Sequence, residues 1–310
     1  MSKTLAVFGA TGNQGSSVVN HVLTTDLSAQ YTIRAITRDL TSPASLALKA
    51  KNVALVQADV QDPSSLARAL SGVHTVFAMT TPSFGPNAVE DEIAVAKNIV
   101  DAAVSQGVKY FIWSTLPNVR EISGGKYTKV TAFDAKAQAE AYIRTLPIKS
   151  AFTNPGFFME NFHSQPFLGP KKQPDGTYVL MRNSSPTSTL PLIAAVEDSG
   201  KFVGTILANP DEYEGVALCA SYKCYTWEEI VQALSKATGK KVVFKEVSDE
   251  EFGETLTFAR DLFVEAYRYE GEFGNYGKDS VELVAWARER ARGRLMDLDE
   301  FLEKNPLTLE

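Results

Sequence analysis

The residues best suited to chemistry lie at the start of the chain, in a glycine turn between an apolar run and a helical segment. Glycines stand at positions 9, 12 and 15 of Gly9-Ala10-Thr11-Gly12-Asn13-Gln14-Gly15. Gly9 permits a sharp exit from a strand, Gly12 lets the backbone approach an anion, and Gly15 lets the helix pack closely. A helix that begins here offers free N–H groups and a partial positive charge to a pyrophosphate. The turn, including Thr11, Asn13 and Gln14, therefore predicts a dinucleotide site.

Arg38 indicates which dinucleotide the turn would hold. An NAD site needs a carboxylate at the end of the second strand for the adenosine ribose 2′-hydroxyl, whereas the 2′-phosphate of NADP needs a guanidinium there. Arg38 lies at that point, and Arg34 lies on the same strand. Asp39 is a competing signal for NAD, because a shift of one residue would bring its carboxylate to the ribose. A solvated charge at the strand end is the structural alternative for Arg38. The residues favour NADP(H).

Six apolar or β-branched runs alternate with helical segments and would position these residues. The expected strands are 4–8, 31–37, 53–58, 74–79, 108–113 and 148–153. Their alternation with helices predicts an α/β fold with a doubly wound parallel sheet, the Rossmann fold. Ligands of such sheets bind beyond the carboxyl ends of the strands. Thr80 and Thr81, in the loop 80–87 after the fourth strand, are therefore expected along the ribose and pyrophosphate.

The regular alternation ends at residue 154, and the rest is expected to form a smaller mixed α/β lobe. It holds short strands at 177–181, 216–220 and 242–247, and no second glycine turn follows a strand. Thr226 and Glu229 form a capping-box pattern at the start of a helix. We therefore expect an NADP-binding Rossmann domain at 1–154 and a substrate- or partner-side lobe at 155–310, interleaved with the first.

Two C-terminal segments carry aromatic and apolar side chains in unusual patterns. Residues 267–277 interleave aromatics with glycines, which fits either a mobile cover over a ligand or a surface loop anchored to the core. In the charged helices of 279–304, the apolar side chains expected to turn inward are Val281, Val284, Trp286 and Leu295.

Composition excludes several classes of function. The chain has 310 residues, 44% hydrophobic and 22% charged, with a net charge of -6, which argues against direct binding of nucleic acid through a broad basic surface. Cys219 and Cys224 have too few His and Cys partners for a zinc site, so we expect reduced thiols and no metal. No apolar run approaches the about 20 residues that span a bilayer, and no secretory signal is expected. The predicted location is the cytoplasm, with the nucleus as the alternative.

Several motifs spread over most of the chain fit one known pattern. Together they resemble the NmrA-like family, an atypical branch of the short-chain dehydrogenase/reductase superfamily. The resemblance implies an NADP-binding protein; some members are redox-sensing regulators that bind partner proteins, and others are reductases. The motifs are the turn at 9–15, Thr37-Arg38-Asp39, Ala58-Asp59-Val60, Phe133-Asp134-Ala135-Lys136, Pro155-Gly156-Phe157-Phe158-Met159-Glu160-Asn161-Phe162 and Thr226-Trp227-Glu228-Glu229-Ile230.

The resemblance also implies further cofactor contacts. Asp59, with Val60 beside it, would lie next to the adenine amino group; a role in a turn is the structural alternative for Asp59. Pro155, Gly156 and Phe157 would cover the nicotinamide end, with Gly156 allowing close approach to the ring.

Lys136 and Ser114 are the candidate catalytic residues. Ordinary members of the superfamily use a Tyr as general acid four residues before a Lys that lowers its pKa and holds the nicotinamide ribose, with a Ser polarising the carbonyl. Lys136 and Ser114 match the Lys and the Ser, but Ala132 stands at the Tyr position and cannot donate a proton. The alternative acids are Lys136 itself and Tyr127. An exposed helix lysine is the structural alternative for Lys136.

Three functions remain open. Ala132 favours an NADP(H)-binding, redox-sensing regulator with weak or no dehydrogenase activity and a regulatory protein partner. The alternative is an NADPH-dependent reductase of a small carbonyl, enone or quinone substrate. A non-redox interaction protein is disfavoured because every feature of the phosphate site is present.

Overall fold

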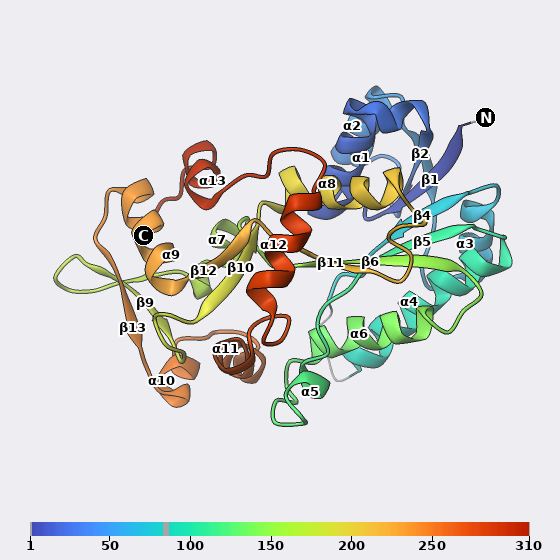
Figure 1. The fold of residues 1–310 in the computed structure, drawn as a ribbon. Helices are drawn as coiled ribbons and strands as arrows, with labels where there is room; N and C mark the ends of the chain where they lie inside the picture. Colours follow the sequence, from blue (N-terminus) through green and yellow to red (C-terminus); the bar gives the residue numbers. More distant parts are fainter. Residues whose placement is uncertain (1, 83–86, 310) are drawn as a thin grey trace.

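A seven-stranded parallel sheet forms the centre of the fold (Figure 1). The computed structural model describes residues 2–82 and 87–309, so residues 83–86 of the expected loop lie outside the described part. The strand order is β11-β6-β5-β4-β1-β2-β3, and all neighbouring pairs are parallel. The strands are β1 (Lys3–Phe8), β2 (Tyr31–Thr37), β3 (Ala54–Gln57), β4 (Thr75–Ala78), β5 (Tyr110–Ser114), β6 (Lys149–Pro155) and β11 (Ala217–Ala220). The predicted doubly wound fold is confirmed. Because the order reverses between β1 and β4, the ligand crevice is expected beyond their carboxyl ends.

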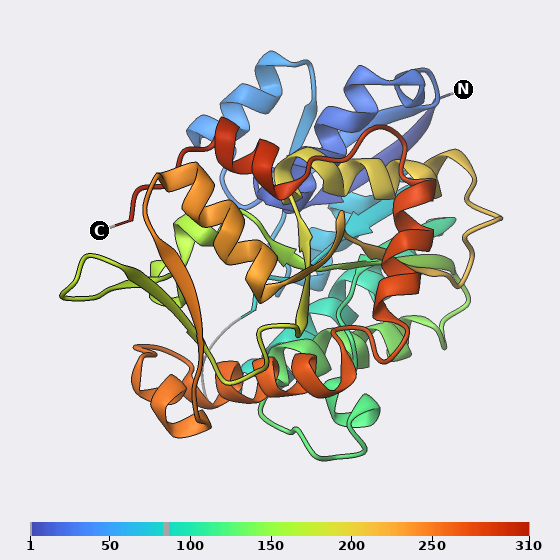
Figure 2. The ribbon, with the colours of Figure 1, turned by 60° about the vertical axis from the view of Figure 1, so that its left-hand side comes forward.

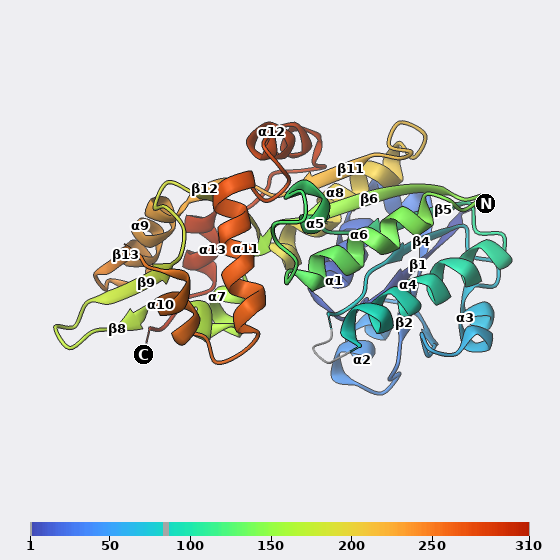
Figure 3. The same cartoon turned by 90° about the horizontal axis from the view of Figure 1, so that it is seen from below.

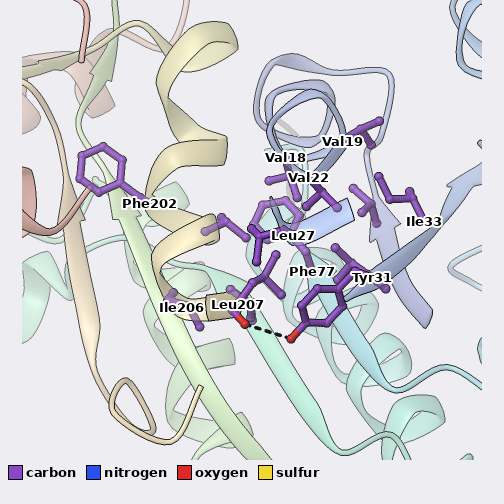
Figure 4. Close-up of a cluster of buried hydrophobic side chains, with 14 of the residues drawn as sticks. Val18, Val19, Val22, Leu27, Tyr31, Ile33, Phe77, Phe202, Ile206 and Leu207 are labelled. Atoms are coloured by element: carbon purple, nitrogen blue, oxygen red, sulfur yellow. Dashed lines mark hydrogen bonds between the residues drawn. The ribbon is translucent and has the colours of Figure 1, made fainter. Parts of the chain in front are cut away.

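Helices cover both faces of this sheet, with α1 and α8 on one face and α4 and α6 on the other (Figure 1). Val18, Val22 and Ile206 pack together on the first face, where the Tyr31 hydroxyl donates to the Leu207 carbonyl oxygen at 3.0 Å (Figure 4). The helices of this half are α1 (Asn13–Thr24), the 3₁₀ turn η1 (Asp26–Ala29), α2 (Pro43–Ala50), α3 (Pro63–Leu70), α4 (Ala88–Ser105), α5 (Val119–Ile122) and α6 (Thr131–Ile143).

The chain beyond residue 154 contributes to this sheet as well as to a second lobe. Strand β11 forms the sheet's edge beside β6, and α8 (Ala195–Ala208) packs on α1. That approach is close, because a Cβ at Gly200 would lie 2.2 Å from the Ser17 carbonyl oxygen. The strand at 216–220 was expected, but its place at the edge of the large sheet and the helix α8 were not, because both depend on contacts far along the chain.

The second lobe lies beside the carboxyl ends of the large sheet's strands (Figure 2; Figure 3). It holds two small mixed sheets, β12-β10-β7 and β13-β9-β8. The capping box at Thr226 and Glu229 is confirmed at the start of α9. The strands are β7 (Phe157–Phe158), β8 (Lys171–Lys172), β9 (Tyr178–Arg182), β10 (Thr189–Ile193), β12 (Lys223–Thr226) and β13 (Val242–Glu246); the helices are α7 (Asn161–Ser164), η2 (Pro166–Leu168), α9 (Trp227–Thr238), α10 (Asp249–Glu254), α11 (Arg260–Phe273), α12 (Ser280–Arg290) and α13 (Leu298–Lys304).

The aromatic segment 267–277 is the end of a helix and a tight turn. Helix α11 continues to Phe273, and Tyr267, Tyr269 and Tyr276 are buried. The Tyr276 hydroxyl donates to the Asn154 carbonyl oxygen at 3.0 Å. These contacts agree with the anchored alternative.

The expectation for the segment 279–304 is half right. Val284 and Leu295 are buried, but Val281 is 54% exposed and Trp286 is 37% exposed, so their predicted inward orientation is wrong. Val284 and Ala287 form the inner face instead. Trp286 lies on the outside under the guanidinium of Arg290, at 4.2 Å from its ring centre.

Two further features of the described residues bear on the sequence expectations. Cys219 and Cys224 are free thiols, and burial raises the pKa of each to about 12. Among the described helices, none is long and apolar enough to cross a membrane.

Candidate functional site

The glycine turn has the geometry of an anion cradle. Gly9 leaves β1 at a φ of 62°, and the Gly12 amide donates to the Gly9 carbonyl oxygen at 2.9 Å. A Cβ at Gly15 would lie 2.1 Å from the same oxygen, so only glycine lets α1 start this close to the turn. No side chain caps the first turn of α1, and no acidic residue stands in it. The helix N-terminus therefore keeps its N–H groups for a negatively charged ligand.

A groove of about 790 Å³ extends from this turn across the ends of β1, β2 and β4. Its walls include all but one of the cofactor residues predicted for the adenosine and pyrophosphate part. These residues are Gly9, Thr11, Gly12, Asn13, Gln14, Gly15, Arg38, Val60, Thr80 and Thr81.

Asp59 is the exception in this set. Its carboxylate accepts a hydrogen bond from the Gln61 amide at 2.9 Å, and its own amide donates to the Ser65 hydroxyl at 3.1 Å. These bonds agree with the turn alternative. Gln61 lines the groove where Asp59 was expected to do so.

The side chains of Arg38 and Asp39 differ in their hydrogen bonding. The Asp39 carboxylate accepts from the amide and the hydroxyl of Thr41 at 2.7 and 2.6 Å, and the hydroxyl contact holds its pKa below the usual value. The Arg38 side chain is exposed at the groove and makes no hydrogen bond or ion pair with the described residues. A guanidinium is thus available for a 2′-phosphate, while the competing carboxylate is held in its own turn.

Arg34 is not part of the site. Its guanidinium donates to the carbonyl oxygens of Ala69 and Ser71, both at 2.8 Å, at the end of α3. The side chain therefore satisfies a helix C-terminus.

Lys136 is buried in an ion pair with Glu92, a residue that the sequence analysis missed. Their side chains are 8% and 3% exposed. The Lys136 ammonium also donates to the carbonyl and hydroxyl oxygens of Thr80, both at 2.8 Å, and the Thr80 hydroxyl donates to Glu92 at 2.5 Å. An ammonium group has three N–H donors, and these three acceptors use them all. Burial is the main influence on the Lys136 pKa and lowers it, against the opposing effect of Glu92.

Ser114 joins the turn to the second part of the site. Its hydroxyl donates to the Gln14 side-chain oxygen at 2.8 Å, and both residues are buried. Gln14 and Thr80 line both the groove and a neighbouring cavity, so the two spaces are continuous.

That cavity has a volume of about 320 Å³ and lies between the large sheet and α11. Its walls are mainly apolar and include the predicted nicotinamide-side residues Pro155, Gly156 and Phe157, together with Lys136 and Ser114. A Cβ at Gly156 would lie 2.4 Å from the Pro191 carbonyl oxygen, so this position needs glycine for packing as well.

The alternative acid Tyr127 is not brought to the cavity. It is 7% exposed and packs edge-on against Tyr269 and Phe273, with both ring centres 6.3 Å away. Ala132 is also absent from the residues that line the cavity. The polar residues there that sequence reasoning missed include Thr115 and Gln165 as well as Glu270 and Asn275, which lie inside the segment 267–277.

A model of the NmrA-like family matches residues 1–302. An NmrA-like family domain-containing protein of Dictyostelium discoideum is 28% identical over 287 residues, which cover 90% of this chain and 92% of the relative. The NmrA-like family domain-containing oxidoreductase ptmS of Penicillium ochrochloron is 32% identical over 260 residues, which cover 79% of this chain and 76% of the relative.

Two solved structures show the same fold and hold the same cofactor type. NmrA, a negative transcriptional regulator, in complex with NADP has a TM-score of 0.78 and 25% identity, covering 98% of this chain and 95% of its own. The triphenylmethane reductase of a Citrobacter species, complexed with NADP(H), has a TM-score of 0.74 and 21% identity, covering 98% and 100%. Both ligands agree with the cofactor predicted from Arg38. The family match over nearly the whole chain supports the same conclusion as the turn, the sheet order and the groove: the chain belongs to the NmrA-like family.

Proposed function

We propose that this protein is an NADPH-dependent reductase of a small, largely apolar carbonyl, enone or quinone compound. The observation that carries the proposal is the cavity of about 320 Å³ that continues from the cofactor groove. A largely apolar pocket with a few polar groups is typical of small-molecule sites. A cofactor-binding protein without an acceptor would not need such a space beside its nicotinamide end.

The residues of the groove fit NADP(H). The turn and the N-terminus of α1 would hold the pyrophosphate, Arg38 the 2′-phosphate, and Val60 with Gln61 the adenine end. Thr80 and Thr81 would lie along the ribose and pyrophosphate. Pro155, Gly156 and Phe157 would cover the nicotinamide, which supplies hydride when NADPH is bound.

Under the reductase proposal, Lys136 and Ser114 act as positioning residues. Lys136 ties Thr80 at the end of β4 to Glu92 of α4, and Ser114 holds Gln14 of the turn. These contacts fix the strand ends where groove and cavity meet. The proton that a carbonyl reduction needs would then come from another group.

A redox-sensing regulator that binds NADP(H) and a protein partner is the second candidate. Two features favour it: Ala132 stands in place of the usual acid, and the full use of the Lys136 donors removes the alternative acid. The regulator NmrA among the solved neighbours supports the same reading.

The test of the proposed function is a comparison of NADPH binding with NADPH consumption. Binding is measured by calorimetry, and consumption by the loss of NADPH absorbance with benzaldehyde, benzylideneacetone and menadione as acceptors. The proposal expects at least one acceptor to be reduced. Tight binding, with a Kd on the order of micromolar, and no consumption with any acceptor would contradict it and favour the regulator.

A further inference from the structure

Two buried polar side chains face the cavity without a partner. Glu270 is 8% exposed and Asn275 is 4% exposed, and both line the cavity. The Glu270 Oε2 atom and the Asn275 Nδ2 atom have no hydrogen-bond partner among the described residues. Buried polar groups are almost always hydrogen-bonded, so two unpartnered polar atoms in residues that line one cavity favour a polar ligand atom at this wall.

Arg182, the cation that acts electrostatically on Glu270, is engaged elsewhere through its two terminal nitrogens, while its Nε atom has no hydrogen-bond partner among the described residues. Arg182 is buried, with its guanidinium 4.7 Å from the ring centre of Trp227 and 4.6 Å from that of Tyr267. It donates to the carbonyl oxygens of Met181 and Leu168 at 2.6 and 2.7 Å. Among the described ion pairs within 4.0 Å, none joins it to Glu270.

Burial controls the ionisation of Glu270. It raises the pKa of the carboxyl group to about 8, and the more distant Arg182 opposes this shift. At neutral pH the group is therefore mostly protonated and can donate a hydrogen bond. Asn275 offers a second donor through its amide N–H groups.

We propose that Glu270 and Asn275 bind the acceptor's carbonyl oxygen and that Glu270 is the proton donor for its reduction, in place of the missing tyrosine. This assignment rests on the proposed reductase function. As hydride from NADPH forms a C–H bond at the acceptor carbon, the carboxyl O–H bond of Glu270 breaks and a new O–H bond forms on the acceptor oxygen. The Glu270 carboxylate then regains a proton from solvent. One hydride and one proton are consumed, and NADP⁺ and the reduced acceptor are released.

The tyrosine side chains around Glu270 stay neutral in the relevant pH range. Burial raises the pKa of Tyr267 to about 12 and raises those of Tyr269 and Tyr276 further. Arg182 faces the carboxyl group from β9. Lys136, on another wall of the cavity, is paired with Glu92, and its pKa is lowered by burial. A variant at Glu270 separates the carboxyl group's contribution from that of Lys136.

The test uses binding of a carbonyl compound that NADPH does not reduce. N-methylcarbostyril is titrated into the full chain saturated with NADP⁺, by calorimetry, between about pH 6 and about pH 9. With the Glu270 pKa at about 8, wild-type affinity should fall about tenfold over this range, because only the protonated carboxyl group donates. Glu270→Gln should bind the probe within about threefold of the wild type at about pH 6 and show no fall. The matched control is Glu272→Gln on the same helix, which loses only an exposed pair with Lys126 and should keep the wild-type profile.

Two further measurements show whether the effects depend on the carbonyl group of the probe. Naphthalene, which lacks a carbonyl group, should bind with the same affinity at both pH values. Asn275→Ala should weaken N-methylcarbostyril about tenfold and leave naphthalene unchanged. Circular dichroism and the melting temperature verify that each variant is folded.

The assignment is wrong if wild-type affinity for N-methylcarbostyril does not change with pH or if Glu270→Gln shows the same fall. If either result is found and an acceptor is nevertheless reduced, the Glu270 assignment is wrong and the reductase function is retained. The expected pH profile without consumption of NADPH by any acceptor would instead support the polar binding site and contradict the reductase function and its proton-donor step.

Discussion

The Lys136 ammonium and the Glu92 carboxylate form a buried ion pair at the junction of the cofactor groove and the neighbouring cavity. Thr80 completes the cluster through its carbonyl and hydroxyl oxygens. A lysine in this state stabilises the strand end more directly than it can serve as an acid, because each of its N–H donors already has an acceptor.

Breaking this pair should destabilise the protein strongly. Glu92→Ala or Lys136→Met leaves one buried charge without its partner, at a cost of about 3–5 kcal/mol in the free energy of unfolding. The double variant Glu92→Leu with Lys136→Met should recover most of that loss, because no charge remains buried. Urea unfolding measures each value. As a control, Lys236→Met breaks an exposed pair with Asp299 and should cost less than about 1 kcal/mol. Single-variant losses as small as that control would show that the pair does not form in solution.

Replacing Arg38 should change cofactor preference. Arg38→Asp is expected to weaken NADPH binding about 100-fold, since a charge-assisted contact to the 2′-phosphate becomes a repulsion, and to change NADH binding less than about threefold. Calorimetric titration with each cofactor gives the ratio. Arg34→Met is the matched control on the same strand; it loses its bonds to the end of α3 and should leave the ratio unchanged. Equal losses for NADPH and NADH in Arg38→Asp would rule out the 2′-phosphate assignment.

Alanine substitutions at two glycines of the turn should affect folding and cofactor binding to different extents. A Cβ at Gly15 would lie 2.1 Å from backbone, so Gly15→Ala should lower stability by about 1–3 kcal/mol or more and reduce NADPH affinity. At Gly12 the nearest atom would be 3.4 Å away, so Gly12→Ala should fold nearly as well as the wild type. It should nevertheless bind NADPH about tenfold more weakly, because the methyl group stands where the phosphate approaches. Melting curves and NADPH titrations distinguish the two; unchanged NADPH affinity in both would contradict a phosphate site at this turn.

Filling the cavity should block reduction and spare cofactor binding. Leu262 lies on α11 and lines the cavity but not the groove. Leu262→Trp is expected to lower kcat/KM for any reduced acceptor about tenfold or more, while the Kd for NADPH stays within about twofold. The exposed Leu283 on α12, replaced in the same way, is the control and should leave both values unchanged. Undiminished turnover in Leu262→Trp would place the acceptor elsewhere.

The first half of the fold could be predicted because its signals are local. Glycine spacing and the alternation of strands and helices depend on neighbouring residues, as does the Thr226 capping box in the second lobe. The strand β11 was expected, but its place beside β6 and the helix α8 on α1 could not be predicted in this way, because both depend on contacts far along the chain.

The catalytic end of the site was the hardest to predict. Glu92 is a charged residue on the inner face of α4, in line with Ala96 and Ile99, and that break in the apolar pattern was the available signal. The pairing of Glu92 with Lys136 could be seen only in the structure, because it depends on the packing of α4 on α6. Glu270 lies among aromatics and glycines that are typical of a loop, yet burial of Tyr267 and Tyr269 stabilises a helix there.

The central claim is that the nicotinamide end of the cofactor meets the apolar cavity. A crystal structure of the NADP⁺ complex tests it most directly. We expect the 2′-phosphate at Arg38, the pyrophosphate at the turn, and the nicotinamide beside Gly156 with its reactive C4 atom facing the cavity wall that carries Glu270. A complex in which the adenosine part occupies the groove but the nicotinamide points to solvent, away from Gly156, would show that the cavity is not the site of hydride transfer.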